Sequence, residues 1–249
     1  MVTGSQQNAD NPPDHQVTRE RLTVGVLGGL GPEATVDFLR KIVDATPATS
    51  DQDHIHLLID HNPGVPNRHA SIAGRAPSVG PQLAQMAQRL EAAGADFLVM
   101  VCNTAHAFEA EISAAVSIPF LSIIDVTVAA LSDSGAARVG VMAAEGCLQA
   151  GLYQQALGAA GYEAILWSDS ELEEFMALIY RIKAGQRHAD IAEGIARLAA
   201  SLVTRGADTL IAGCTEIPLF LHAQASPAPL FQSTDLLVQR TIALAKGDT

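Results

Sequence analysis

The chain has 249 residues, of which 48% are hydrophobic and 17% charged, enough apolar material for one large domain or two small lobes with real cores. Its formal net charge is -12 at pH 7, and it has no run rich in Lys and Arg, so we expect no nucleic-acid partner. Its apolar runs are too short to span a membrane and its polar N-terminus lacks the apolar core of a signal peptide, so we expect a cytoplasmic protein.

Residues 1–20 combine Pro, Asn, Asp and Gln with almost no apolar content, and we expect a disordered tail there. Beyond it, short apolar runs alternate with segments of helical spacing, which is typical of an α/β fold with a parallel sheet covered by helices. The expected strands are Leu22–Leu27, His54–Ile59, Phe97–Val101, Phe120–Ile124, Arg138–Met142, Glu163–Trp167 and Thr209–Ala212. The expected helices include Pro81–Ala93, Gln149–Ala160, Glu171–Lys183 and Ile191–Arg205.

The sequence also repeats itself. Ala93–Cys102 matches Arg205–Cys214 at a constant offset of 112 residues, with Gly, Ala, Asp, Leu and Cys identical in both copies. A second match, between Arg21–Val26 and Ala136–Val141, has an offset of 115. The repeat predicts two related α/β lobes, which we place at residues 21–118 plus 228–249 and at residues 119–227.

Two of the three cysteines occupy equivalent places in this repeat. Cys102 and Cys214 each end a predicted strand, where ligands bind in open parallel sheets. A helix beginning there could lower a thiol pKa from about 8.5 toward neutrality. One such cysteine would be read as a small buried residue, but two, each followed by polar residues, favour a chemical role. We expect Cys147 to be structural, and three cysteines make no disulfide framework.

The first predicted strand runs into the glycine-rich turn Gly28–Ala34. Glycines allow close backbone approach and Pro32 suits a first helical turn, so this turn is a candidate for holding an anion. The same residues fit the relaxed G-x-G-x-x-G/A dinucleotide pattern, with Asp51 and Asp53 about 20 residues on. That alternative leaves the paired cysteines unexplained.

Three motifs together resemble the aspartate/glutamate racemase family, and its aspartate racemase branch in particular: Gly28–Thr35, Cys102–His106 and Cys214–Leu219. The segments His61–Arg68 and Tyr180–Gly185 also fit. The resemblance implies two pseudo-symmetric lobes with the active site in the cleft between them, a homodimer, and no pyridoxal phosphate or metal. It implies an isomerase that racemises aspartate or glutamate.

Racemisation removes the Cα proton on one face and returns a proton on the other, so two acid/base groups must flank the substrate. We expect Cys102 and Cys214 to be these groups, one a thiolate and one a thiol, with roles that exchange with direction. The charge that develops on the α-carboxylate needs aimed donors. The candidate donors are the backbone N–H groups of Gly28, Gly29, Asn103, Thr104, Thr215 and Glu216.

Four charged or titratable side chains complete the expected site. His106 and Glu216 could tune thiol ionisation or orient the substrate ammonium, or could simply complete helix hydrogen bonds. By the resemblance, Arg68 and Lys183 match positions that recognise the side-chain carboxylate, a task that suits a bidentate Arg. Asn67 stands where the family pattern has Asp, and Arg75 is additional, so aspartate specificity stays open.

Two other functions remain open. A cysteine-dependent decarboxylase or cis–trans isomerase of the same superfamily would also build negative charge beside a carboxylate, although the presence of both cysteines argues against decarboxylation. The second open function is that of a two-lobed protein that binds amino acids without catalysing a reaction.

Overall fold

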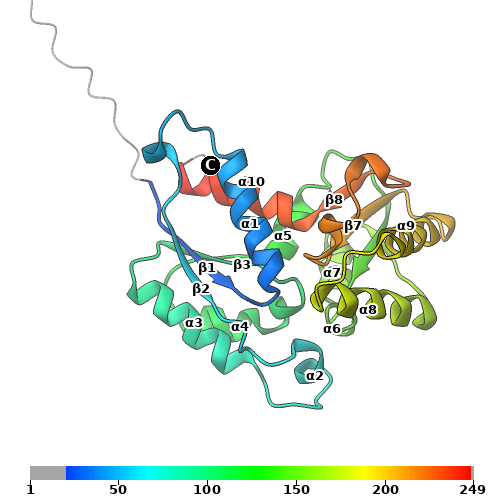
Figure 1. Cartoon of the computed structure of the whole chain (residues 1–249), viewed down its shortest axis with the longest axis horizontal. Helices are drawn as coiled ribbons and strands as arrows, with labels where there is room; N and C mark the ends of the chain where they lie inside the picture. Colours follow the sequence, from blue (N-terminus) through cyan, green and yellow to red (C-terminus); the bar gives the residue numbers. More distant parts are fainter. Residues whose placement is uncertain (1–20, 248–249) are drawn as a thin grey trace, which may run out of the picture.

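The computed structural model describes residues 21–247 and contains two four-stranded sheets, one in each lobe (Figure 1). The first has the order β2-β1-β3-β4 and the second β6-β5-β7-β8, and every strand pairing is parallel. The strands are β1 (Val24–Gly28), β2 (Leu57–His61), β3 (Phe97–Met100), β4 (Phe120–Leu121), β5 (Arg138–Ala143), β6 (Glu163–Ile165), β7 (Thr209–Gly213) and β8 (Leu230–Gln232). The predicted α/β fold with two related lobes is confirmed. The predicted tail, residues 1–20, lies outside the described residues.

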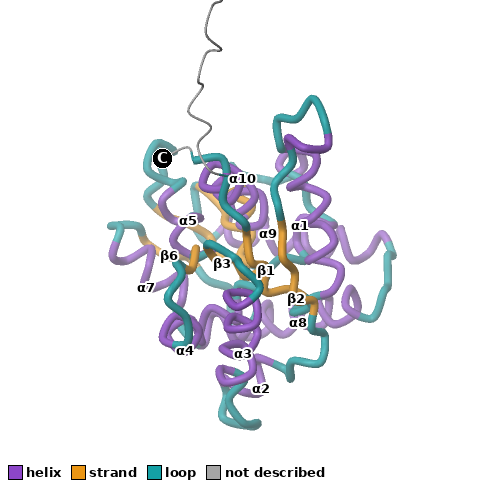
Figure 2. Tube along the Cα trace, turned by 90° about the vertical axis from the view of Figure 1, so that its left-hand side faces the viewer, coloured by secondary structure: helices purple, strands orange, loops and turns teal. Residues whose placement is uncertain are grey.

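Helices surround the strands on all sides (Figure 2). They are α1 (Pro32–Ala45), α2 (Arg68–Ile72), α3 (Gly80–Ala92), α4 (Glu109–Ala114), α5 (Ile123–Ala129), α6 (Glu145–Gln149), α7 (Leu152–Ala159), α8 (Asp169–Lys183), α9 (Ala189–Thr204) and α10 (Ser233–Ala245). None of the helices within residues 21–247 is long and apolar enough to cross a membrane.

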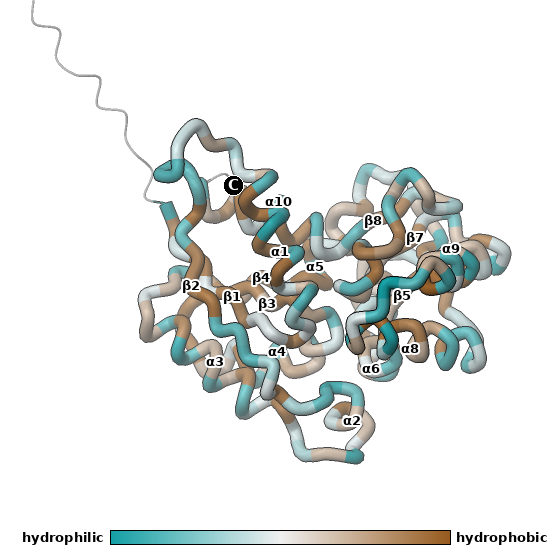
Figure 3. The backbone as a smooth tube through the Cα atoms, viewed as in Figure 1, coloured by the Kyte–Doolittle hydropathy of each residue, from teal (hydrophilic) through white to brown (hydrophobic). Residues whose placement is uncertain are grey.

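The buried apolar residues form three cores. A central core joins the inner faces of both sheets to α1, α5, α7 and α10. Two outer cores pack the first sheet against α3 and α4 and the second against α8 and α9. In β3, Phe97 and Val99 enter the central core while Leu98 and Met100 enter the outer one, as the two-residue period of a strand requires. The hydrophobic stretches follow the strands accordingly (Figure 3).

The structure explains why the sequence repeats. Gly25 in β1 and Gly140 in β5 each lie against an equivalent Leu, Ala and Leu, which are Leu98, Ala95 and Leu90 in the first lobe and Leu210, Ala207 and Leu202 in the second. A Cβ on either glycine would approach the facing leucine to 2.6 Å. The repeated Gly-Ala-Asp therefore preserves a close approach of helix to strand, and its Asp carboxylates accept backbone N–H groups at the start of β1 and β5.

The lobes exchange one helix each. α5 follows β4 of the first sheet and packs on α7 of the second lobe, while α10 follows β8 of the second sheet and lies beside α1 of the first lobe (Figure 1). Since β4 pairs with β3 and β8 with β7, the first sheet runs to Leu121 and the second to Gln232. Both strands therefore lie a few residues after the predicted lobe boundaries at 118/119 and 227/228. A run as short as Phe120–Leu121 gives little sequence signal, and Ile123 and Ile124, predicted as strand, begin α5.

Candidate active site

Both cysteines stand at the carboxyl ends of central strands, as predicted. Cys102 comes two residues after β3 and Cys214 directly after β7, and 3-10 helices follow at η2 (Thr104–Phe108) and η3 (Ile217–Leu219). The two cysteines are 8% and 7% exposed, and both are free thiols. Each strand passes through the middle of its sheet, so its end is held by hydrogen-bonded neighbours on both sides. Rigid strands therefore fix the positions of both sulfur atoms.

One cavity receives both thiols. Of the residues proposed from the sequence, the cavity is lined by Cys102, Cys214, Arg68, Asn103, Thr104, Lys183, Thr215 and Glu216. Its volume is about 20 Å³, room for about one water molecule and far too little for an amino acid. The cavity therefore has to widen before any amino acid can bind in it.

A buried charged cluster lies on the Cys214 side of this cavity. The Cys214 thiol donates to Glu216 Oε2 at 3.1 Å, and Lys183 Nζ lies 3.3 Å from Glu216 Oε1. Burial opposes ionisation of Glu216, but Lys183 and the thiol hydrogen bond hold the pKa of Glu216 below its ordinary value. Burial likewise opposes the charge of Lys183, and Glu216 raises the pKa of Lys183 above its ordinary value. Glu216 and Lys183 thus form an ionised pair beside a protonated thiol.

The expected lowering of the thiol pKa is wrong for Cys214. Burial and the adjacent Glu216 carboxylate raise the pKa of Cys214 well above its ordinary value, although Lys183 acts in the other direction. The helix that follows is a three-residue 3-10 helix, so it adds little dipole to offset a full negative charge close by. Cys147 is structural in the sense predicted, because it lies in the central core and burial raises the pKa of its thiol.

Arg68 reaches the cavity, but its guanidinium is occupied by the backbone. It donates to the carbonyl oxygens of Val65 at 3.0 Å and Pro66 at 2.9 Å, and to that of Leu30. These bonds join the loop before α2 to the turn after β1. Arg68 is therefore placed to hold the cavity wall together as well as to supply a positive charge. Asn67, the departure from the family pattern, caps α2 through its side chain.

Gly28, Gly29 and His106 lie outside the cavity lining. The Gly29 N–H donates to Thr35 Oγ1 at 2.9 Å, so it is not a free anion donor, and Gly29 needs its positive φ of 81° to pass Asn62 and Pro63. His106 Nδ1 donates to the Cys102 carbonyl at 2.8 Å and its Nε2 accepts from Ile123 N at 3.1 Å. Burial lowers the pKa of His106 to about 4. Both nitrogens serve backbone groups, which is the structural alternative left open above.

His69 is the residue that sequence reasoning missed. It lines the cavity next to Arg68, and its Nδ1 accepts from Gly146 N of the other lobe at 3.1 Å. This bond joins α2 to α6, which pack against each other. Burial, together with the charges of Lys183 and Arg68, lowers the pKa of His69 to about 4. The only sequence signal was its place directly after Arg68, and its partner is 77 residues away.

A groove of about 280 Å³ adjoins the cavity and gives a route to the surface. Leu30, Arg68, Lys183 and Glu216 line both spaces, and Gly29 lies in the groove. Arg187 and Glu33 form an ion pair between the lobes, with Glu33 lining this groove and the Arg187 guanidinium over the Phe220 ring. The side chains shared by the two spaces therefore form the boundary between the cavity and the groove.

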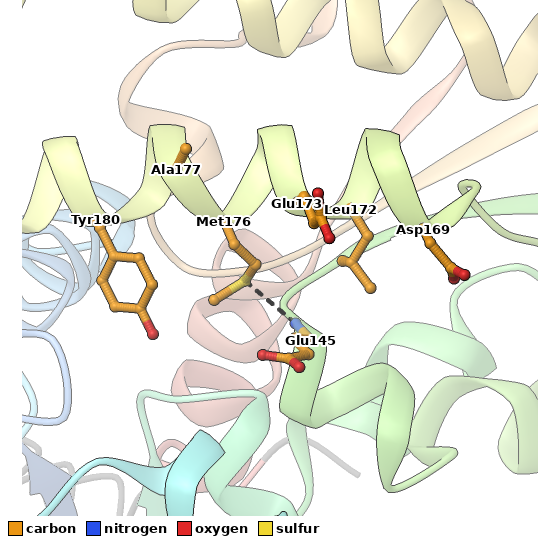
Figure 4. Close-up of a pocket in the computed structure, with 7 residues that line it drawn as sticks. All are labelled: Glu145, Asp169, Leu172, Glu173, Met176, Ala177 and Tyr180. Carbon is orange, nitrogen blue, oxygen red and sulfur yellow. Dashed lines mark hydrogen bonds between the residues drawn. The ribbon is translucent and has the colours of Figure 1, made fainter.

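A larger groove of about 570 Å³ lies between α6 and α8 and shares no residue with the cavity (Figure 4). Glu145, Asp169, Leu172, Glu173, Met176, Ala177 and Tyr180 line it, and the Glu145 N–H donates to Met176 Sδ at 3.3 Å. It contains none of the catalytic or binding residues proposed from the sequence, although Tyr180 begins a segment that fits the family pattern. Within residues 21–247, no group of three or more His, Cys, Asp and Glu side chains is arranged to hold a metal ion.

Comparisons with known proteins agree with this geometry. The family model described as Asp/Glu/Hydantoin racemase matches residues 27–241. The chain is 27% identical over 223 residues to the broad specificity amino-acid racemase RacX of Bacillus subtilis (strain 168), covering 88% of this chain and 96% of RacX. The structure of the Picrophilus torridus aspartate racemase aligns with a TM-score of 0.81 and 27% identity, covering 90% and 94% of the two chains. A glutamate racemase from Bacillus anthracis, at 22% identity and a TM-score of 0.62 over 92% and 84%, shares the fold.

Proposed function

The chain belongs to the Asp/Glu/hydantoin racemase family, and from this premise we propose that it inverts the Cα configuration of a free amino acid, aspartate or glutamate, by a two-base reaction. Membership of the family confirms the resemblance drawn from the sequence and the enzyme class, an isomerase. One observation supports the two-base step above all others. Cys102 and Cys214, from equivalent strand ends of the two lobes, line a single cavity.

The hydrogen bond to Glu216 assigns a starting role to each cysteine. Cys214 begins as the thiol, because its proton is shared with a carboxylate and its thiolate would face that negative charge. Cys102 is then the group left to act as the base in this direction. The Cα proton passes to Cys102 Sγ, and Cys214 Sγ delivers its own proton to the opposite face of the planar carbanion. In the reverse direction the roles exchange, so that Cys214 Sγ takes the Cα proton and Cys102 Sγ delivers its proton to the other face.

The charges in the cavity fit a dicarboxylic amino acid. Arg68 and Lys183 supply two positive charges and Glu216 one negative charge, while His69 is neutral at pH 7. Two positive side chains therefore face the cavity, and aspartate or glutamate has two carboxylates for them to meet, whereas alanine has only one. Lys183 is the better candidate for the side-chain carboxylate, because the Arg68 donors are largely used by carbonyl oxygens.

The test is to incubate the protein in deuterated water with each enantiomer of aspartate and glutamate, and with alanine as a substrate lacking the second carboxylate. We expect the wild type to invert the dicarboxylic acids and to incorporate Cα deuterium. Cys102→Ser and Cys214→Ser should each lose inversion, but each can still exchange the Cα proton of one enantiomer with retention, through the thiol that remains. Cys147→Ala is the matched control and should still racemise, because Cys147 lines no part of the cavity.

Three outcomes would contradict the proposal. Normal inversion by either serine variant would exclude the two-base step. Binding of these acids without Cα exchange by the wild type would indicate a binding protein. A product that has lost a carboxyl group would indicate a decarboxylase.

The homodimer implied by the resemblance belongs to the same proposal. Light scattering coupled to size-exclusion chromatography measures it directly, and a monomer at the concentrations used for the assay would contradict it. That neither pyridoxal phosphate nor a metal takes part stays a prediction, tested by adding a carbonyl reagent or a chelator to the assay.

A further inference from the structure

A buried chain of hydrogen bonds connects the two strands that carry the cysteines. Tyr153 Oη lies 2.6 Å from Asn103 Oδ1, Asn103 Nδ2 lies 3.1 Å from Ser233 Oγ, and Ser233 Oγ lies 2.8 Å from the Ala212 carbonyl oxygen. Asn103 directly follows Cys102, and Ala212 lies in β7, two residues before Cys214. Tyr153 comes from α7 and Ser233 begins α10. All three side chains are almost completely inaccessible to solvent.

The chemistry of these groups sets the direction of each bond. The Ala212 carbonyl can only accept, so the Ser233 hydroxyl gives it its single hydrogen. Toward Asn103, Ser233 Oγ then acts as the acceptor, which places the amide NH2 on that side. The amide oxygen consequently faces Tyr153, whose hydroxyl donates to it. Burial raises the pKa of Tyr153, so this hydroxyl keeps its proton.

The amide of Asn103 is thereby fixed with one donor to spare. Ser233 takes only one of the two Nδ2 hydrogens, and Asn103 lines the cavity that both thiols enter. A hydrogen bond accepted by Oδ1 from Tyr153 also polarises the amide and strengthens the N–H as a donor. If the amide were turned over, it would present an oxygen to a carboxylate and repel it.

This chain of hydrogen bonds is found in only one of the two repeats. At the offset of 115, Tyr153 corresponds to Phe38, which is equally buried but has no hydroxyl, and at the offset of 112, Asn103 corresponds to Thr215. Close packing of the interior therefore requires an aromatic ring at this place but not its hydroxyl. The Tyr153 hydroxyl donates to Asn103 Oδ1 instead.

We propose that Tyr153 and Ser233 are positioning residues, which hold Asn103 so that an amide N–H meets the α-carboxylate of the bound amino acid as negative charge develops on it. The inference rests on the proposed racemisation. An aimed donor at that oxygen stabilises the transition state more than the ground state, because the charge on the carboxylate grows as the proton leaves Cα. A variant in which the Asn103 amide N–H is no longer held toward the carboxylate should therefore lower kcat more than it raises KM.

The test compares Tyr153→Phe, Ser233→Ala and Asn103→Ala, each alone and Tyr153→Phe combined with Asn103→Ala. Both positioning variants should lower kcat by about 10- to 100-fold, with a smaller change in KM. In the Asn103→Ala background, Tyr153→Phe should cause no further loss of kcat, because the proposed effect of its hydroxyl on catalysis passes through that amide, although Thr127 and Ser233 also contact the hydroxyl. Thr241→Val removes another buried hydroxyl, one with no partner among residues 21–247, and serves as the control that should keep wild-type kinetics.

The outcomes separate this inference from the proposed function. A wild type that racemises, together with a Tyr153→Phe variant that is folded and unimpaired, overturns the positioning role alone. Additive losses in the double variant also overturn it, since they would mean that Tyr153 acts independently of Asn103. If Tyr153→Phe does not fold, a folded and unimpaired Ser233→Ala variant would overturn the positioning role in its place. A wild type that shows no Cα exchange overturns the proposed function and this inference with it.

Discussion

The Cys214 thiol donates a hydrogen bond to the buried carboxylate of Glu216, with Sγ and Oε2 3.1 Å apart. The equivalent position beside Cys102 is Thr104, which has no charge. Two thiols at matching strand ends thus stand in different electrostatic surroundings. In the proposed mechanism, this asymmetry favours Cys214 as the thiol that supplies the proton.

Glu216→Gln should lower the pKa of Cys214, because it removes the negative charge that opposes the thiolate and leaves Lys183 unpaired beside it. In a Cys102→Ser background, the thiolate absorbance near 240 nm should then appear at lower pH than with Glu216 present. With both cysteines present, kcat/KM should fall by about 10- to 100-fold. The fall must be equal in the two directions, since the equilibrium constant of a racemisation is one. An unchanged absorbance profile would show that Glu216 does not control Cys214.

Lys183→Met should destabilise the fold by about 1–3 kcal/mol at pH 7.5, because it leaves Glu216 buried without its partner. Lys183 and the thiol hydrogen bond hold the pKa of Glu216 below its unfolded value, so this stability is present above that value and is lost as the pH falls through the folded pKa. The difference between wild type and variant in urea unfolding should therefore shrink as the pH falls below 4.5. Adding Glu216→Gln should restore part of the loss, and a double variant less stable than Lys183→Met would contradict the pairing.

Two buried histidines should make the protein sensitive to acid. The pKa values of His69 and His106 are about 4 in the folded state, against 6.5 ordinarily, so the unfolded state binds more protons between these values. The stability that each contributes is complete above pH 6.5 and is lost as the pH falls toward 4, by about 3 kcal/mol at most for the fully buried His106. Urea unfolding at pH 7, 6, 5 and 4.5 measures the slope. His69→Asn should reduce this slope, because it removes one of the two titrating groups. The Asn oxygen can still accept from Gly146 N, so the contact between the lobes is kept. The exposed His222→Asn should leave it unchanged.

Gly146→Ala should loosen the contact between the lobes. A Cβ at Gly146 would lie 2.7 Å from His69 Nδ1 and 3.0 Å from Thr104 Cγ2, so α2 and the turn after Cys102 must shift. We expect a loss of about 1–3 kcal/mol in stability and a larger fall in kcat/KM than that loss explains. Gly158→Ala in α7 is the matched control, since a Cβ there meets nothing within 4 Å and should leave the protein as stable or slightly more so. Equal behaviour of the two variants would show that the His69 contact carries no function.

Much of the fold could be predicted because its determinants are local. The strand ends at Cys102 and Cys214 follow from apolar runs, and the Gly-Ala-Asp repeat encodes the close packing of helix on strand in each lobe. The sequence implied that α5 and α10 pack in the opposite lobe only through the predicted lobe boundaries, which placed residues 119–227 in the second lobe and 228–249 in the first. β4 was predicted within the longer run Phe120–Ile124, but its end was not, and β8 was missed, because two or three residues give too little periodicity to fix a strand.

The sequence by itself determined that two equivalent thiols end two equivalent strands, since the same residues recur at a fixed spacing and parallel sheets bring strand ends to one edge. Only the tertiary structure decided which of the proposed residues are free to act. The Gly29 N–H is taken by the Thr35 hydroxyl, both His106 nitrogens bond to backbone groups, and Arg68 donates to backbone carbonyl oxygens. His69, Tyr153 and Ser233 reach partners in distant segments, 77, 50 and 21 or more residues away. Which buried polar groups pair depends on how the two lobes pack together, because each buried donor must find whatever acceptor that packing brings within reach.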